Sequence, residues 1–184
     1  MDPMETFRRA AAQADRLAGA VRADQLGDPT PCRDWDVRTL VNHVVTGNLL
    51  FASYVTGQPA PDRSADHVVG DAAGAMRMSL AVLTEAFAME GMLDRTYPTP
   101  FGDGSGTLLV DLRGKELTVH SWDLARATNQ VTALDQSLFS DVLDSFHEVP
   151  AIPRGDGKAF GPERPAPPDA SPADRLAAFL GREV

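Results

Sequence analysis

Cysteine and long apolar runs are almost absent from this sequence of 184 residues, and both absences restrict what it can be. With a single cysteine, Cys32, the chain cannot form an internal disulfide or a thiolate cluster around a metal. A metal site would have to be built from histidine and carboxylate side chains. No apolar run approaches the roughly 20 residues that span a bilayer, and the N-terminus lacks the apolar core of a secretory signal. We therefore expect a cytoplasmic protein with no membrane role.

Positive charge is also scarce, since 17 Lys and Arg stand against 26 Asp and Glu and give a formal net charge of −9. An acidic surface repels phosphate backbones, and the arginines gather into no basic patch, so no nucleic-acid partner is expected. A chain of this length can bury one hydrophobic core but not two comfortable ones, which predicts a single domain over residues 1–184. The oligomeric state is left open, with a homodimer among the options.

Helical spacing of apolar residues is the dominant pattern along the chain. It predicts four long helices: 4–22, from Val37 to a stop at Gly57 and Pro59, from Val69 to Phe87, and 107–128. Shorter helices are expected at 135–148 and 173–180. Pro and Gly within 93–106 predict a small hairpin, and the prolines of 150–172 predict an extended strap. The expected fold is all-α: a four-helix bundle with a small hairpin and a Pro-rich C-terminal tail that ends in a short helix.

The fourth expected helix carries the residues with the clearest chemistry. With Glu116 set at zero and about 100° per residue, Glu116 lies in the middle of the apolar face, and His120 and Asp123 lie on the same face. A buried carboxylate needs a partner, which a metal ion can supply. Glu116 and His120 are four residues apart, the spacing of the two histidines in the H-E-x-x-H zinc helix. The apolar residues that define this face are Leu109, Leu112, Val119, Leu124 and Ala127.

A third ligand should come from another helix. His43 borders the apolar face of the second expected helix, and Gly47, one turn on, leaves space beside its imidazole. His67 lies in a polar loop and His147 lies beside acidic residues, so His43 is the expected ligand. The alternative is that His43 is a core histidine bonded to a carbonyl, with Glu116 paired to a neighbour on its own helix.

Two charged neighbours of this face have open roles. Asp123 can orient a ligating imidazole as a partner behind the metal, or it can form a salt bridge with Arg126. Arg113 can meet a substrate carboxylate, or it can neutralise Glu116.

Cys32 and the two tryptophans, Trp35 and Trp122, are expected to serve structure. Cys32 precedes the second helix, and His43 lies about two turns inside it, roughly 10 Å further along. Cys32 is therefore expected to be a buried structural thiol and not a ligand.

Two segments carry a resemblance to a known family: TPCRDWDVRTLVNHVVTGN (30–48) and ELTVHSWDLARATNQ (116–130). With the tail FGPERPAPPDASPADRLAAFLGR (160–182), they resemble the DinB-like metal-binding proteins of actinobacteria related to the N-terminal domain of mycothiol-dependent maleylpyruvate isomerase. Members of that family are four-helix bundles that hold a metal through a His on helix two and an E/H-x-x-x-H pair on a later helix. The resemblance implies that His43, Glu116 and His120 are the metal ligands.

The resemblance also implies a chemistry, because some relatives use mycothiol with the metal binding its sulfur. It implies a metal-dependent thiol S-transferase or isomerase that acts on a small-molecule thiol and an electrophilic substrate. Zinc is the first expectation for two imidazoles and a carboxylate, and nickel or iron also suit such ligands. The alternative is a non-catalytic metal-binding protein with a regulatory or partner-binding role. Maleylpyruvate isomerisation itself is not expected, because the isomerase carries a second domain that this chain is too short to contain.

Overall fold

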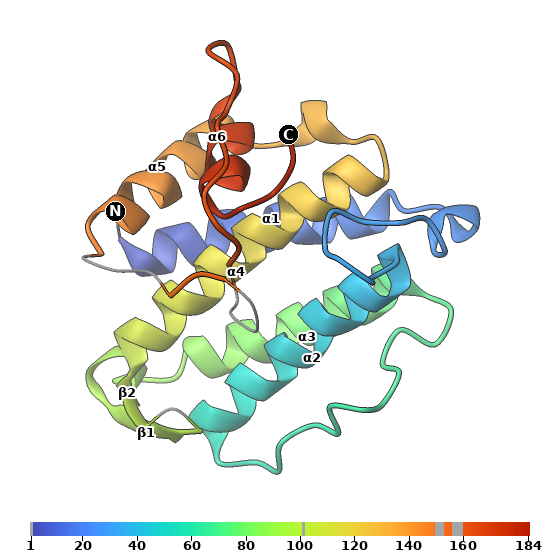
Figure 1. Ribbon diagram of the computed structural model, residues 1–184. Coiled ribbons are helices and arrows are strands. Elements are labelled where there is room, and N and C mark those ends of the chain that lie inside the picture. The colour runs from blue at the N-terminus through green and yellow to red at the C-terminus, as the bar shows by residue number, and fades with distance from the viewer. Residues whose placement is uncertain (1, 101, 150–152, 156–159) are drawn as a thin grey trace.

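The computed structural model describes residues 2–100, 102–149, 153–155 and 160–184, and this described part is mainly helical. It holds six α-helices, three short 3-10 turns and a two-stranded antiparallel sheet (Figure 1). Each α-helix begins after an Asp or Ser whose side chain accepts a hydrogen bond from a backbone N–H of the first turn, so local sequence sets the starts. In chain order the elements are α1 (Pro3–Gly19), η1 (Ala23–Gln25), α2 (Val37–Thr56), α3 (Ala72–Phe87), η2 (Met92–Asp94), β1 (Thr96–Thr99), β2 (Gly102–Ser105), α4 (Gly106–Ala127), η3 (Val131–Ala133), α5 (Gln136–His147) and α6 (Pro172–Phe179).

The long helices pack in pairs around one hydrophobic core. α1 lies along α4 and α2 lies along α3, while contacts of α1 with α3 and of α2 with α4 join the two pairs. α5 and α6 pack on each other and on α4, and the red C-terminal segment lies over α4 in Figure 1. No helix of the described part is long and apolar enough to cross a membrane. The largest fully buried apolar side chains include Phe7, Leu17, Leu40, Met76, Leu83, Leu117, Trp122 and Phe139.

The predicted hairpin is confirmed, because β1 and β2 pair antiparallel from Thr96 opposite Ser105 to Thr99 opposite Gly102. α1 ends at Gly19, short of the expected residue 22, since glycine is a poor helix former and the chain then turns into η1.

The expected start of the third helix at Val69 was wrong. Val69 has a φ of 36° and is 79% exposed, and the helix begins only after Asp71, whose carboxylate accepts the N–H of Gly74 at 2.8 Å. The neighbouring Val68 is the buried valine of this segment, at 2% exposure. A spacing pattern cannot tell which of two adjacent valines faces the core when the helix has not yet begun.

The buried face of α4 is wider than expected, and its middle lies at a different angle around the helix axis. Leu112, placed on the buried face, is 46% exposed, and Glu116 lies at the edge of the buried arc, not in its middle. The shift arises because α4 packs most extensively on α1, and its buried residues include small and polar ones that an apolar pattern does not count. These include Gly114, Thr118 and Ser121.

The expected strap at 150–172 falls partly on residues 150–152 and 156–159, which lie outside the described part. In the rest of it, Arg154 and Phe160 form an isolated bridge, and no helix or strand occurs among the described residues until α6. α6 occupies nearly the range expected for it.

Candidate metal centre

The three expected ligands lie around one point between α2 and α4. His43 comes from α2, Glu116 and His120 come from α4, and one ligand atom of each lies within 4.8 Å of the other two. Nε2 of His43 is 3.1 Å from Oε1 of Glu116, and the rings of His43 and His120 meet edge to face with centroids 4.9 Å apart. The packing of α2 on α4 therefore converts two separate sequence segments into one cluster of donor atoms.

Arg113 occupies the space that Gly47 leaves on α2. A Cβ at Gly47 would lie 2.5 Å from Nη1 of Arg113, so it is this guanidinium, and not the imidazole of His43 as expected, that requires glycine here. The Nε–H of Arg113 donates to Oδ1 of Asn48 at 2.9 Å, and Nη2 donates to the carbonyl of Val44 at 2.7 Å. The side chain is thus tied to α2 at several points.

Arg113 also forms an ion pair with Glu116. Its Nη1 lies 2.6 Å from Oε2 of Glu116, and the arginine side chain is 0% exposed while that of Glu116 is 30% exposed. Burial alone would raise the pKa of Glu116, but the charge of Arg113 and the hydrogen bond with His43 hold it well below its usual range. Of the two roles left open for Arg113, neutralisation of Glu116 is the one its complete burial favours.

Asp123 lies behind His120, fully buried, with its two oxygens held by an arginine that the sequence did not single out. Oδ2 of Asp123 is 3.0 Å from Nδ1 of His120, while Arg182 donates to Oδ1 at 2.7 Å and to Oδ2 at 2.8 Å. The alternative salt bridge to Arg126 was wrong, because the guanidinium of Arg126 lies 5.4 Å from the ring centre of Trp122 instead. Burial would raise the pKa of Asp123, but hydrogen bonds from Arg182 and His120 hold it below its usual range, so it is ionised.

The contact with Asp123 determines which ring nitrogen of His120 is left for a metal ion. An ionised carboxylate only accepts hydrogen bonds, so the Nδ1 of His120 that faces it carries the proton. In the neutral form of the ring, Nε2 of His120 is then the nitrogen without a proton, and such a nitrogen is the one that binds a metal.

Cys32 also reaches this site, contrary to the expectation that it lies too far away. Its thiol donates to Oδ2 of Asp123 at 3.2 Å, and its sulfur is 4.0 Å from Nδ1 of His120. These three residues form a second group of donor atoms that lie within 4.8 Å of one another. Burial, followed by the charge of Asp123, raises the pKa of Cys32 to about 12, so the thiol is protonated at neutral pH.

The distance argument failed because the loop before α2 folds back on itself. Pro29 and Asp36 form an antiparallel bridge, so the residues between them form a turn and do not extend the axis of α2. The same turn carries Trp35, whose ring centre is 4.7 Å from that of His43 and 6.2 Å from that of His120. Trp35 therefore packs on the site itself.

Neither of the other histidines joins the cluster. His67 contacts the carbonyl of Asp62 at 3.0 Å, and His147 packs edge-on against Phe179 with ring centres 4.9 Å apart. Arg182 was missed because a single arginine near the end of the chain follows no periodic pattern. The only signal for it was its position at the end of the tail segment quoted above, 160–182.

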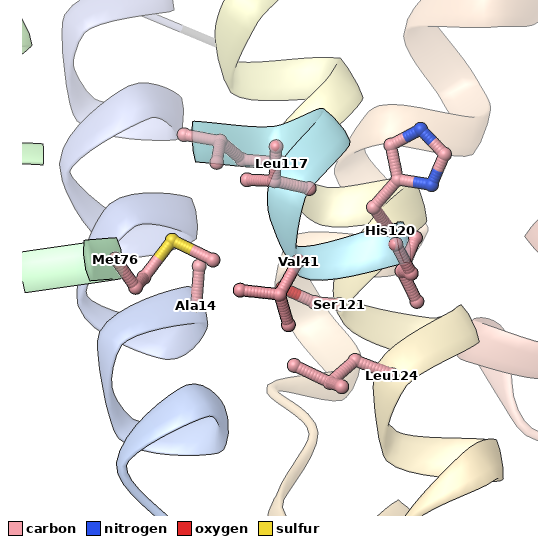
Figure 2. A pocket seen from close by; sticks show the side chains of 9 residues that line it. Ala14, Val41, Met76, Leu117, His120, Ser121 and Leu124 are labelled. Carbon is pink, nitrogen blue, oxygen red and sulfur yellow. The ribbon is translucent and has the colours of Figure 1, made fainter. Parts of the chain in front are cut away.

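Two hollows of different size lie next to residues of the site. A cavity of about 10 Å³ lies in the core beside His120. Figure 2 shows Ala14, Val41 and Met76 in its lining, with the ring of His120 turned away from them. A cavity of that size holds at most one water molecule. A larger hollow of about 340 Å³ lies at the loop before α2, and its lining includes Cys32 and Trp35. Small-molecule sites begin at about this volume.

Comparison with known proteins places the chain in a family. The family described as the mycothiol maleylpyruvate isomerase N-terminal domain matches residues 7–125. Uncharacterised proteins of two Mycobacterium tuberculosis strains are each 39% identical over 186 residues, covering 100% of both chains.

Two solved structures share the fold. The crystal structures of mycothiol-dependent maleylpyruvate isomerase and of a point mutant of it superpose with TM-scores of 0.54 and 0.56 at 18% and 17% identity. The match covers 66% of this chain and 59% of the isomerase chain, so this chain corresponds to part of the isomerase. With more than half of its residues matched, including those of the cluster on α2 and α4, the chain belongs to the mycothiol maleylpyruvate isomerase N-terminal domain family.

Proposed function

We propose that this protein is a metal-dependent thiol S-transferase or isomerase, with His43, Glu116 and His120 holding a divalent cation at which a mycothiol-like thiol binds. The observation that carries the proposal is the convergence of these three donor groups within 4.8 Å, from two helices that pack on each other. We further propose that residues 1–184 form one DinB-like domain in which α1 to α4 make a four-helix bundle.

The donor set fits a divalent cation. Arg113 engages Oε2 of Glu116, so Oε1 is the oxygen that faces His43. Asp123 engages Nδ1 of His120, which leaves Nε2 to bind a cation. Two imidazoles and one carboxylate are the ligands of many catalytic zinc sites, which keep a fourth position open. Nickel and iron accept the same ligands, so zinc is proposed from its common use of this set.

The remaining residues have supporting tasks. A divalent cation held by these residues would supply Lewis-acid chemistry, which favours the thiolate form of a thiol at neutral pH. Arg113 keeps Glu116 ionised, Asp123 orients His120, and Trp35 covers the ring of His43 next to the hollow at the loop. The thiol is proposed to be mycothiol because the structural relatives are named for it, and the second substrate is an electrophile.

Metal analysis of purified protein tests the ligand assignment. His43→Ala, Glu116→Ala and His120→Ala should each lose most of the bound metal that wild type retains, while circular dichroism shows a helical protein. His67→Ala is the matched control, since His67 contacts a loop carbonyl outside the cluster. Full occupancy in one of the three variants would remove that residue from the site.

Calorimetry with mycothiol tests the function. Zinc-loaded wild type should bind the thiol with release of a proton, counted by repeating the titration in two buffers of different ionisation enthalpy, and binding should strengthen as pH rises toward the pKa of the thiol. His120→Ala should show no such binding. Zinc-loaded wild type that binds no thiol would favour the non-catalytic, metal-binding alternative.

A further inference from the structure

Arg182 enters the site from a part of the chain that lies beyond residues 7–125, the range matched by the family. α6 ends in a tight turn at Gly181, where φ is 91°, and the N–H of Arg182 donates back to the carbonyl of Ala177 at 3.0 Å. α6 itself is tied to α4 by the Trp122 Nε1–H, which donates to Asp174 at 2.9 Å. These contacts aim the Arg182 side chain at α4.

The guanidinium of Arg182 grips Asp123 in a fork. Its Nε and Nη2 donate to the two carboxylate oxygens at 2.7 and 2.8 Å, and the side chains are 13% and 0% exposed. Paired hydrogen bonds of this kind fix the plane of the carboxylate as well as its place. Asp123 also accepts from the Cys32 thiol and faces His120, so the groups around it leave it little freedom to rotate.

The same fork decides between two groups of donor atoms that share His120. One group contains His43 and Glu116, and the other contains Cys32 and Asp123. In the second group, Arg182 engages both oxygens of Asp123, and the Cys32 thiol and Nδ1–H of His120 point at the same carboxylate. In the first group, Arg113 engages only Oε2 of Glu116. A cation is therefore favoured in the first group alone.

We propose that Arg182 is a positioning residue of the metal centre: by holding Asp123 in a fork, it fixes His120 with Nδ1–H toward Asp123 and Nε2 toward the cation. This inference rests on the proposed function for the identity of the cation site, but the orientation of His120 exists without the metal. Without Arg182, Asp123 would be a buried carboxylate that has lost two hydrogen bonds and is free to turn away from His120. His120 would then lose its fixed tautomer.

Three variants test the inference with two measurements. The variants are Arg182→Ala, Arg182→Lys and the matched control Arg175→Ala. Arg175 is an exposed arginine of α6 whose side chain donates to the carbonyl of Pro168 at 3.4 Å. The first measurement is titration with Co²⁺ followed by its visible absorption. The second is nitrogen-detected NMR of the imidazole rings in the metal-free protein, which reports which nitrogen of His120 is protonated.

Arg182→Ala should bind Co²⁺ roughly 10- to 100-fold more weakly, the usual loss when the partner behind a ligating histidine is disturbed. Its His120 should show a mixture of tautomers where wild type shows Nδ1–H. Arg182→Lys should lie between wild type and Arg182→Ala in both measurements. An ammonium keeps the charge but is a point charge that cannot donate two parallel hydrogen bonds to the carboxylate. Arg175→Ala should match wild type in both measurements.

Two outcomes would overturn the inference: wild-type Co²⁺ affinity in both Arg182 variants, or an unchanged His120 tautomer in both. Arg182→Lys keeps the charge, so it carries the test if Arg182→Ala does not fold. Wild type that binds no Co²⁺ would count against the proposed function, while the ring nitrogens of His120 in metal-free protein would still decide the role of Arg182.

Discussion

At the scale of single residues, the site depends on charges that are buried in pairs. Arg113 is fully buried, and its charge is balanced by Glu116, while Asp123 is fully buried and balanced by Arg182. A buried ion pair adds little net stability, but removing one partner strands the other charge and typically costs about 3–5 kcal/mol. The value of these pairs lies in fixing which atoms of Glu116 and His120 face the cation site.

Gly47→Ala should destabilise the protein. The added Cβ would lie 2.5 Å from Nη1 and 3.0 Å from Cζ of Arg113, whose guanidinium is tied to Asn48 and Val44 and cannot simply swing away. Overpacking of this kind costs about 1–3 kcal/mol, which exceeds the gain of up to about 1 kcal/mol from replacing a helical glycine. Urea unfolding of both proteins measures the difference.

Gly19→Ala is the matched control, because a Cβ at Gly19 meets nothing within 4 Å. It should leave the unfolding midpoint unchanged or raise it slightly. Equal midpoints for wild type and Gly47→Ala would show that Arg113 moves at no cost.

At the scale of elements, α2 owes its starting point to one carboxylate. The Asp36 side chain accepts the N–H of Thr39 at 2.7 Å and so satisfies one of the donors that the first turn leaves unpaired. Because α2 carries His43, this cap also fixes where the histidine lies along the helix axis relative to α4.

Asp36→Ala should lower the free energy of unfolding by about 0.5–2 kcal/mol, the usual cost of losing such a cap. Asp36→Asn should stay close to wild type, since asparagine caps helices about as well as aspartate. Thermal unfolding of the three proteins at neutral pH compares them. An equal loss in both variants would mean that the charge of Asp36 matters and the cap does not.

At the scale of the whole molecule, the buried carboxylates set how stability depends on pH. The pKa values of Glu116 and Asp123 are both held below the usual range, because nearby cations outweigh the effect of burial. A carboxylate with a lowered pKa stabilises the folded state fully above its ordinary pKa of about 4. That stabilisation is lost as pH falls from there toward the folded-state value.

The metal-free protein should therefore unfold more easily below about pH 4, with little change from pH 5 to 7 on account of these carboxylates. Asp123→Asn should start from a lower stability at pH 7 and lose less of it on acidification, because its missing carboxylate cannot take up a proton. Urea unfolding at a series of pH values gives both slopes. If the free energy of unfolding of Asp123→Asn falls with pH as steeply as that of wild type, this account is contradicted.

Local interactions within the sequence determined most of the helix bounds and the helix faces on which the three ligand candidates lie. Helix caps and apolar spacing act over a few residues, so the starts at Asp36 and Asp135 and the stop at Gly57 were readable without the fold. The same periodicity placed His43, Glu116 and His120 toward neighbouring helices.

Only the tertiary structure decided what surrounds those ligands. Cys32 and Arg182 are separated from Asp123 by 91 and 59 residues, and they meet it because a loop folds back and a C-terminal turn points inward. The surroundings of Gly47 have the same origin. The space beside it on α2 is filled by Arg113 from α4 and not, as expected, by the imidazole of His43. Such contacts depend on how separate elements pack, and no periodic pattern within one element records them.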